Sequence, residues 1–159
     1  MATHVVIGDP HCTPKASNER FLWAGRLAAD VRATHIICMG DFCSMDSLSS
    51  YDKKKKSFEG RRYQKDMEHS HEALSLFNKG LGKHKPRKIM LHGNHEDRID
   101  RFVDENPELD GTLKISDLQF KKYGWQEIPY KKFKVVNGVH YAHHFPSGIM
   151  GSAISGENI

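Results

Sequence analysis

The sequence predicts an α/β fold in which parallel strands alternate with helices. Three short apolar runs, at 3–8, 35–39 and 88–92, each lead into a glycine followed by polar residues, and helical patterns separate them. Runs of this length bounded by turn residues are typical of buried strands. A length of 159 residues allows one compact domain with a real core, so we treat 1–159 as a single domain.

The segment between the first two strands has a helical pattern. Ser17 or Asn18 can cap a helix that runs to about Ala33. Apolar or small residues recur in it at helical spacing and form one face: Phe21, Leu22, Gly25, Ala28 and Ala29. Strand, helix and strand therefore follow one another, as they do in a βαβ unit.

Two more helices are expected after the second strand. The pattern over 64–81 lacks proline and indicates a long helix, which Gly80 and Gly82 end. A shorter helix from His95 to about Glu105 follows the third strand. The order of elements therefore continues to alternate.

The C-terminal part is expected to be antiparallel. Apolar or alternating runs at 125–128, 130–136 and 139–143 predict three strands. The dipeptide Asn137-Gly138 between the last two is a strong hairpin signal, because these residue types tolerate the positive φ of a tight turn. The tail that follows is rich in glycine and serine, and 155–158 (SGEN) looks like the start of a helix whose body is absent.

Basic residues concentrate in one segment. Residues 51–66 (YDKKKKSFEGRRYQKD) hold seven Lys and Arg and three Asp and Glu. Their excess of four positive charges equals the whole formal charge of +4. Tyr51, Phe58 and Tyr63 interleave with the cations, a composition that suits the backbone and bases of a nucleic acid. A solvated loop leading into a helix is the alternative interpretation. The candidate substrate-binding cations are Lys53, Lys54, Arg61 and Arg62.

The composition argues against several classes of protein. The longest apolar runs are far shorter than the roughly 18 residues of a membrane span, and the N-terminus lacks the pattern of a secretory signal. We therefore expect no membrane partner and a cytoplasmic location. Cys12, Cys38 and Cys43 are too few for a disulfide framework and lack C-x-x-C spacing, so we expect reduced thiols.

Residues with metal-ligand chemistry follow all three of the first strands. They are Asp9-Pro10-His11, Gly40-Asp41 and Gly93-Asn94-His95-Glu96. The carboxyl ends of parallel strands meet at one edge of a sheet, where ligands bind. A mixed set of carboxylate, imidazole and amide groups suits manganese, iron, zinc or cobalt more than calcium or magnesium. The ordered trio therefore predicts a metal site at that edge.

These motifs, D-P-H at 9–11, G-D at 40–41 and G-N-H-E at 93–96, resemble those of the calcineurin-like metallophosphoesterase superfamily in order and spacing. The resemblance covers about residues 3–145. It implies a β-sandwich flanked by helices, and an enzyme that hydrolyses phosphate esters with two divalent ions. Manganese is our first choice, and iron, zinc, cobalt or nickel are the alternatives.

The resemblance also implies which residues bind the metals. A family histidine at the end of a later strand can here be His140, His143 or His144, and His143 fits best because the strand ends there. The implied ligands are Asp9 and His11 for the first metal, Asp41 as the bridge, and Asn94 and His143 for the second.

The catalytic roles follow from the same resemblance. Two adjacent dications lower the pKa of a shared water, so a bridging hydroxide can attack the phosphorus. Asp41 can serve both ions, and Asn94 and His95 would contact the substrate. His95, beside the metal ligands, would protonate the leaving group as general acid.

The sequence departs from the family pattern in two places. Many members carry an Asp three residues after the bridging Asp41 that orients the acid histidine, but this chain has Ser44 there, and its nearest carboxylate is Asp46. No histidine follows His144, so the family's closing G-H-x-H is absent from the sequence. We therefore expect a fragment that lacks the C-terminal strands of the fold and binds metal more weakly.

The basic segment 51–66, directly after the Asp41 loop, favours a phosphodiester or nucleic-acid substrate over a small monoester. A catalytically silent metal- or nucleic-acid-binding module of the same fold is the alternative function. The missing G-H-x-H favours that alternative, whereas the intact His95 argues against it.

Several of these residues also have simpler interpretations. Asp41 could cap a helix over 44–50, and Glu96 could be a first-turn acid that suits the helix dipole. Arg98 or Arg101 could face the phosphate, but neither is assigned a role.

Overall fold

A computed structural model describes residues 2–51 and 53–145, so the expected helix start at 155–158 lies outside the described part. The centre of the fold is a four-stranded sheet in the order β1-β2-β3-β4. All three neighbouring pairs are parallel. The strands are β1 (His4–Ile7), β2 (His35–Cys38), β3 (Arg87–Leu91) and β4 (Trp125–Ile128). The predicted α/β class is therefore confirmed.

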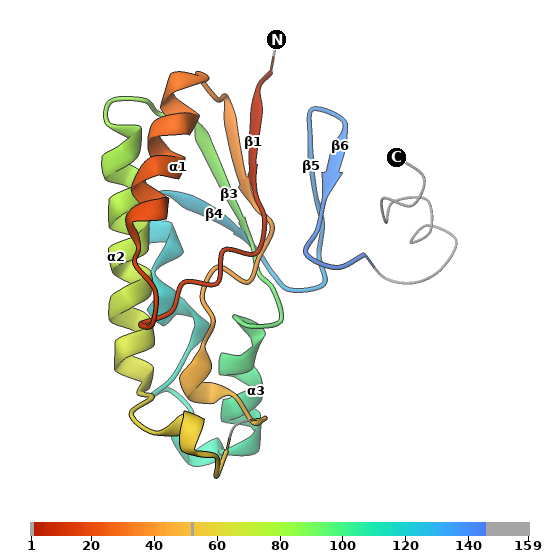
Figure 1. The fold of residues 1–159 in the computed structure, drawn as a ribbon. Coiled ribbons are helices and arrows are strands. Elements are labelled where there is room, and N and C mark those ends of the chain that lie inside the picture. Colours follow the sequence, from red (N-terminus) through yellow and green to blue (C-terminus); the bar gives the residue numbers. More distant parts are fainter. Residues whose placement is uncertain (1, 52, 146–159) are drawn as a thin grey trace.

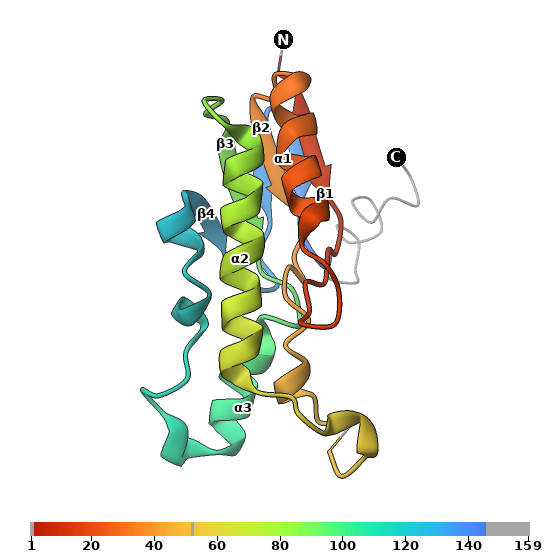
Figure 2. The ribbon, with the colours of Figure 1, turned by 60° about the vertical axis from the view of Figure 1, so that its left-hand side comes forward.

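Two helices, α1 (Glu19–Asp30) and α2 (Tyr63–Leu81), lie side by side and cover one face of the sheet (Figures 1 and 2). The contact between them is close at two glycines. A Cβ atom on Gly25 would overlap the backbone of α2, and one on Gly80 would overlap the backbone of α1. The prediction that Gly80 ends the second helix is therefore wrong, because Gly80 lies inside α2. A glycine is needed there because the neighbouring helix leaves no room for a side chain. Gly82 follows the last turn of α2, as predicted.

The first helix is shorter than expected. It ends at Asp30 rather than near Ala33, because Arg32 adopts a positive φ of 51° and turns the chain toward β2. At its start, the side chain of Asn18 donates hydrogen bonds to α2 instead of capping α1, at 2.9 Å to the carbonyl oxygen of His69 and 2.8 Å to Oε2 of Glu72. Asn18 thus ties the two helices together.

The direction of the strand at 125–128 differs from the expectation. It was predicted to belong to an antiparallel part, but β4 pairs parallel with β3. A parallel neighbour requires a long crossover, and α3 (Asp97–Glu105) together with three 3₁₀ turns at 107–109, 115–118 and 120–123 provides it.

The hairpin at the C-terminal end of the described chain is confirmed. Strands β5 (Lys134–Val136) and β6 (Val139–Tyr141) are antiparallel, and the predicted strand at 130–136 is limited to its last three residues. Asn137 and Gly138 have φ values of 50° and 84°, the two positive angles that a tight hairpin turn requires.

The hairpin packs on the face of the sheet opposite the helices (Figure 1). Val136 and Tyr141 join Ile37, Ile89 and Leu91 in a small apolar cluster, which is separate from the main core under α1 and α2. The result is three layers, with the parallel sheet between the helices and the hairpin. No helix within residues 2–51 and 53–145 is long and apolar enough to cross a membrane.

The parallel topology brings the segments that follow the strands to one end of the sheet. The loops after β1 and β2 also bind each other through their backbones. His11 N donates to the carbonyl oxygen of Asp41 at 3.0 Å, Cys12 N donates to that of Phe42 at 2.8 Å, and Ser44 N donates back to that of Cys12 at 2.9 Å. This backbone pairing fixes His11 beside Asp41.

Candidate metal centre

Asp41 lies at the centre of the predicted site, and its side chain is almost completely buried. Three imidazoles surround its Oδ2 atom: Nε2 of His143 is 3.6 Å away, that of His95 is 3.7 Å away, and that of His11 is 3.9 Å away. A metal ion about 2.1 Å from each of its ligands separates the ligand atoms by roughly 3 to 3.5 Å. Each nitrogen therefore lies slightly farther from Oδ2 than two ligands of one ion would lie from each other.

Two glycines allow the residues to come this close. A Cβ atom on Gly93 would overlap Oδ1 of Asp41, and one on Gly40 would lie 2.7 Å from Nδ1 of His143. Gly40 also has a φ of 106°, which few other residues adopt. The glycines in the G-D and G-N-H-E motifs are thus required by the space between the strand ends.

The backbone around Asp41 is held by Glu96, whose side chain is fully buried. Its Oε2 accepts hydrogen bonds from the N–H groups of Asp41 (3.0 Å) and Gly93 (2.7 Å), and its Oε1 accepts one from Cys43 (3.1 Å). Burial raises the pKa of Glu96 to about 7, although the hydrogen bonds from Cys43 and Gly93 act in the opposite direction. Glu96 therefore connects the loops after β2 and β3.

Sequence reasoning missed this role of Glu96, which was interpreted as a first-turn acid. The available signal was its spacing from Gly93. A glutamate three residues after the start of a helical segment can reach back to a free backbone N–H, as in a capping box. The predicted capping role of Asp41 is not observed, because its Oδ1 accepts a hydrogen bond from His95 N (2.9 Å) and the next helical turn begins only at Asp46.

His143 is the histidine of the 139–144 segment that reaches the site, as predicted. Its Nδ1 lies 2.9 Å from the carbonyl oxygen of Met39 and 3.6 Å from Oδ1 of Asp9, and its Nε2 lies 3.1 Å from Oδ1 of Asn94. A neutral imidazole has one N–H, which the Met39 carbonyl can accept. The Nε2 lone pair then faces two oxygens, those of Asn94 and Asp41, an arrangement that suits a bound cation.

The orienting partner of His95 is a backbone group. Its Nδ1 donates a hydrogen bond to the carbonyl oxygen of Ser44 at 2.7 Å, while Asp46 contacts Thr13 at 3.3 Å. Nε2 of His95 is therefore the acceptor for the guanidinium of Arg98, at 3.0 Å. Burial lowers the pKa of His95, and Arg98 lowers it further, whereas Asp41 raises it.

One group of donor atoms has the geometry of a metal site. The ligand atoms of His11, Asp41 and His95 all lie within 4.8 Å of one another, so these residues could hold a metal ion. The grouping includes His95, which the resemblance assigned to acid catalysis. Asp9, which was expected to share the first metal with His11, is half exposed and contacts His143 instead.

Three histidines that belong to none of the motifs connect distant segments of the chain. Nε2 of His69, His71 and His84 each lies within 3.0 Å of a backbone carbonyl oxygen on another segment, those of Ala16, Asp117 and Ala33. Cys12, Cys38 and Cys43 are buried free thiols.

The four predicted substrate-binding cations do not gather at the site. Lys53 contacts α3, with its Nζ 5.2 Å from the ring centroid of Phe102. Arg61 donates to the backbone of Ser57 and Asp46, and Lys54 and Arg62 line an open hollow within the basic segment itself.

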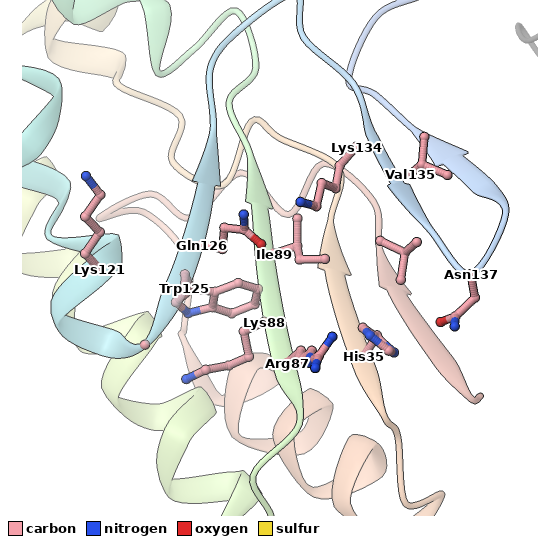
Figure 3. A pocket seen from close by; sticks show the side chains of 12 residues that line it. His35, Arg87, Lys88, Ile89, Lys121, Trp125, Gln126, Lys134, Val135 and Asn137 are labelled. Carbon is pink, nitrogen blue, oxygen red and sulfur yellow. The ribbon is translucent and has the colours of Figure 1, made fainter. Parts of the chain in front are cut away.

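Cavities occur at both ends of the sheet. A small one of 160 Å³ lies beside Asn94 and is lined by α3 and the segment at 48–51. A larger one, of 660 Å³, lies between the hairpin and the amino-terminal ends of β2, β3 and β4, where Arg87, Lys134 and His35 line it (Figure 3). None of the predicted metal ligands lines the larger cavity.

Comparison of the sequence with protein-family models and with curated proteins found no match.

Proposed function

We propose that this chain is the core of a metal-dependent phosphoesterase of the calcineurin-like type, which uses two divalent ions to hydrolyse phosphate esters. The observation that carries the proposal is the convergence on Asp41. His11, His95 and His143 come from three separate segments, and each places Nε2 within 3.9 Å of one carboxylate oxygen. Buried carboxylates seldom collect three imidazoles unless a cation or a reaction requires them.

The donor set fits divalent transition metals. His11 would hold one ion, Asn94 and His143 the second, and Asp41 could serve both. Asp9, whose Oδ1 lies 3.6 Å from Nδ1 of His143, would have to turn toward His11 to join the first. Imidazole, carboxylate and amide oxygen together favour manganese, iron, zinc, cobalt or nickel. When bound, such ions would neutralise phosphate charge and activate a water as nucleophile.

The protein residues position the remaining groups. The Ser44 carbonyl holds His95 so that its Nε2 faces Asp41. Nε2 accepts a hydrogen bond from Arg98, so it would take up a proton in place of that bond before giving it to a leaving oxygen. Glu96 fixes the backbone of Asp41, and the Met39 carbonyl fixes His143. Preorganisation of this kind keeps the reacting groups in place without motion during the reaction.

The finer fold is part of the proposal. We infer that the hairpin belongs to the second sheet of a β-sandwich. In support of this, the hairpin already packs on the sheet through Val136 and Tyr141. Val6, Val135 and Val139 remain 44–49% exposed, which leaves apolar surface for further strands.

A phosphodiester or nucleic acid is the preferred substrate. Lys53 connects the basic segment to α3 beside the site, which supports this choice. The alternative, a silent metal- or nucleic-acid-binding module, predicts metal binding without turnover.

The test is hydrolysis of bis-p-nitrophenyl phosphate and of p-nitrophenyl phosphate by the purified chain with Mn²⁺. We expect activity that is higher on the diester and that falls at least about a hundredfold in Asp41→Asn and His95→Ala. Equal rates for the wild type and both variants would assign the activity to something other than this site. Metal binding without turnover would favour the silent module.

A further inference from the structure

The small cavity beside Asn94 connects the metal centre to α3. Its volume is 160 Å³, and its walls include Leu48, Tyr51, Arg98, Arg101 and Phe102. Pockets that enclose a whole small ligand usually measure about 300 to 1,000 Å³. This cavity can therefore receive one group of a ligand whose remainder lies outside it.

One wall of the cavity carries the guanidinium of Arg98. Arg98 donates hydrogen bonds to the carbonyl oxygen of Ser44 (2.9 Å) and to Nε2 of His95 (3.0 Å), and both acceptors are uncharged. Within residues 2–51 and 53–145, no carboxylate forms an ion pair with Arg98, although Asp41 and Asp46 lie near enough to interact with its charge. An anionic group at the candidate metal centre could therefore form a direct contact that these carboxylates do not make.

Its neighbour Arg101 differs in this respect. Nε of Arg101 lies 3.1 Å from Oδ2 of Asp97, and its NH2 group donates to the Asn94 carbonyl at 3.0 Å. The charge of Arg101 is thus balanced by Asp97, and its guanidinium holds the backbone of Asn94, a predicted metal ligand. An anionic group at the candidate metal centre would therefore form an ion pair with the guanidinium of Arg98.

Leu48, Tyr51 and Phe102 add apolar and aromatic surface to a lining that is otherwise polar. Phe102 lies under Nζ of Lys53, and Tyr51 is 82% exposed. Glu105 also lines the cavity, so a second phosphate placed beside it would meet a carboxylate. The three apolar and aromatic side chains can instead contact a neutral planar group.

We propose that Arg98 binds the phosphate of the substrate at the metal centre and that this cavity receives a neutral aromatic group attached to that phosphate. The substrates are then aryl or nucleoside phosphate esters. This inference rests on the proposed phosphoesterase function, whose substrate class it specifies.

The test is calorimetric titration of the full chain, loaded with Mn²⁺, with phenyl phosphate, methyl phosphate and pyrophosphate. We expect phenyl phosphate to bind most tightly. Arg98→Gln should weaken phenyl and methyl phosphate alike by about tenfold or more, as for loss of a charged hydrogen bond. Tyr51→Ala, at an exposed position that leaves folding unaffected, should weaken phenyl phosphate and leave methyl phosphate unchanged.

Arg87→Gln is the matched control, because Arg87 lines the cavity at the other end of the sheet. Equal affinity for phenyl and methyl phosphate in the wild type, or an equal loss in Arg87→Gln and Arg98→Gln, would overturn the inference. Tighter binding of phenyl phosphate without hydrolysis of any ester would contradict the proposed phosphoesterase activity and support the aromatic-binding cavity. Hydrolysis of esters without tighter binding of phenyl phosphate would support the activity and contradict the aromatic-binding cavity.

Discussion

The candidate metal centre and the basic segment 51–66 were both singled out in the sequence, and their side chains are arranged very differently in the structure. At the metal centre, side chains from three strand ends meet within 3.9 Å of one oxygen of Asp41. In the basic segment, the cations contact scattered groups: Arg62 donates to the carbonyl oxygen of Arg61, Arg61 donates to that of Asp46, and Lys53 lies over the ring of Phe102. The first region is defined by its geometry and the second mainly by its charge.

Only one of these two kinds of sequence pattern determines where the side chains lie. A motif directly after a strand inherits its position from the sheet, because parallel neighbours end at the same edge. A run of lysines has no such anchor, and its composition does not say where each cation lies. Predictions that distinguish the two regions should therefore give large effects at the metal centre and small ones in the basic segment.

The largest effect is expected for Gly93→Ala. The added Cβ would overlap Oδ1 of Asp41, so the carboxylate must move from its position among the imidazoles. We expect metal binding to be lost and hydrolysis to fall by about a hundredfold or more, since displacement of reacting groups by about 1 Å can cost that much. Gly8→Ala is the control, because a Cβ atom there meets nothing within 4 Å. Similar losses in both variants would contradict the assigned geometry.

A smaller effect is expected for Glu96→Gln, which is nearly isosteric. The amide oxygen can accept the two N–H groups that Oε2 accepts, but the NH₂ group would face the N–H of Cys43. Leaving that donor without a partner should cost about 1 to 3 kcal/mol of unfolding free energy, measured by urea denaturation. Wild-type stability in this variant would show that Glu96 does not hold the loops.

The same residue predicts a pH dependence. Burial raises the pKa of folded Glu96 to about 7, above its ordinary value of 4.5 in the unfolded chain. The folded state therefore binds more protons between these values, and stability from this group falls as pH rises from about 4.5 to about 7. With chelator present, the difference in unfolding free energy between wild type and Glu96→Gln should become smaller as pH rises from about 4.5 to about 7. A difference that becomes larger over this pH range would contradict the raised pKa of Glu96.

The smallest effect is expected in the basic segment. Lys54→Ala combined with Arg62→Ala should leave metal binding and hydrolysis of small esters within about twofold, because both residues lie outside the metal centre. Affinity for single-stranded DNA should fall and become less sensitive to salt. Lys121→Ala with Lys134→Ala, at the far cavity, removes the same charge as a control. Equal losses in both double variants would mean that the total charge matters and not its position.

Much of the metal centre was predictable from the sequence because its motifs lie next to strands. Asp41, His11, Asn94 and His143 were all named, and they converge. The roles of Glu96 and Arg98 were not predicted, since both depend on which backbone groups of another loop lie within reach. The place of Ser44 in the sequence did not reveal that its carbonyl oxygen orients His95.

The fold was predictable in class but not in every connection. Apolar runs located the strands, whereas the direction of β4 depends on a crossover whose short turns leave little periodic signal. Gly80 was interpreted by its usual role near a helix end, and the reason for it lies instead in the packing of α1 against α2. Such contacts between distant segments are tertiary and have no local pattern.

The central claim is that Asp41 bridges two metal ions held by His11 on one side and His143 on the other. Electron paramagnetic resonance of the Mn²⁺-loaded chain, recorded with a calorimetric titration of Mn²⁺, tests it most directly. The account predicts uptake of two ions with a spin-coupled signal, which is lost in Asp41→Asn while His140→Ala leaves it unchanged. Uptake of a single uncoupled ion, or a coupled signal that survives Asp41→Asn, would contradict it.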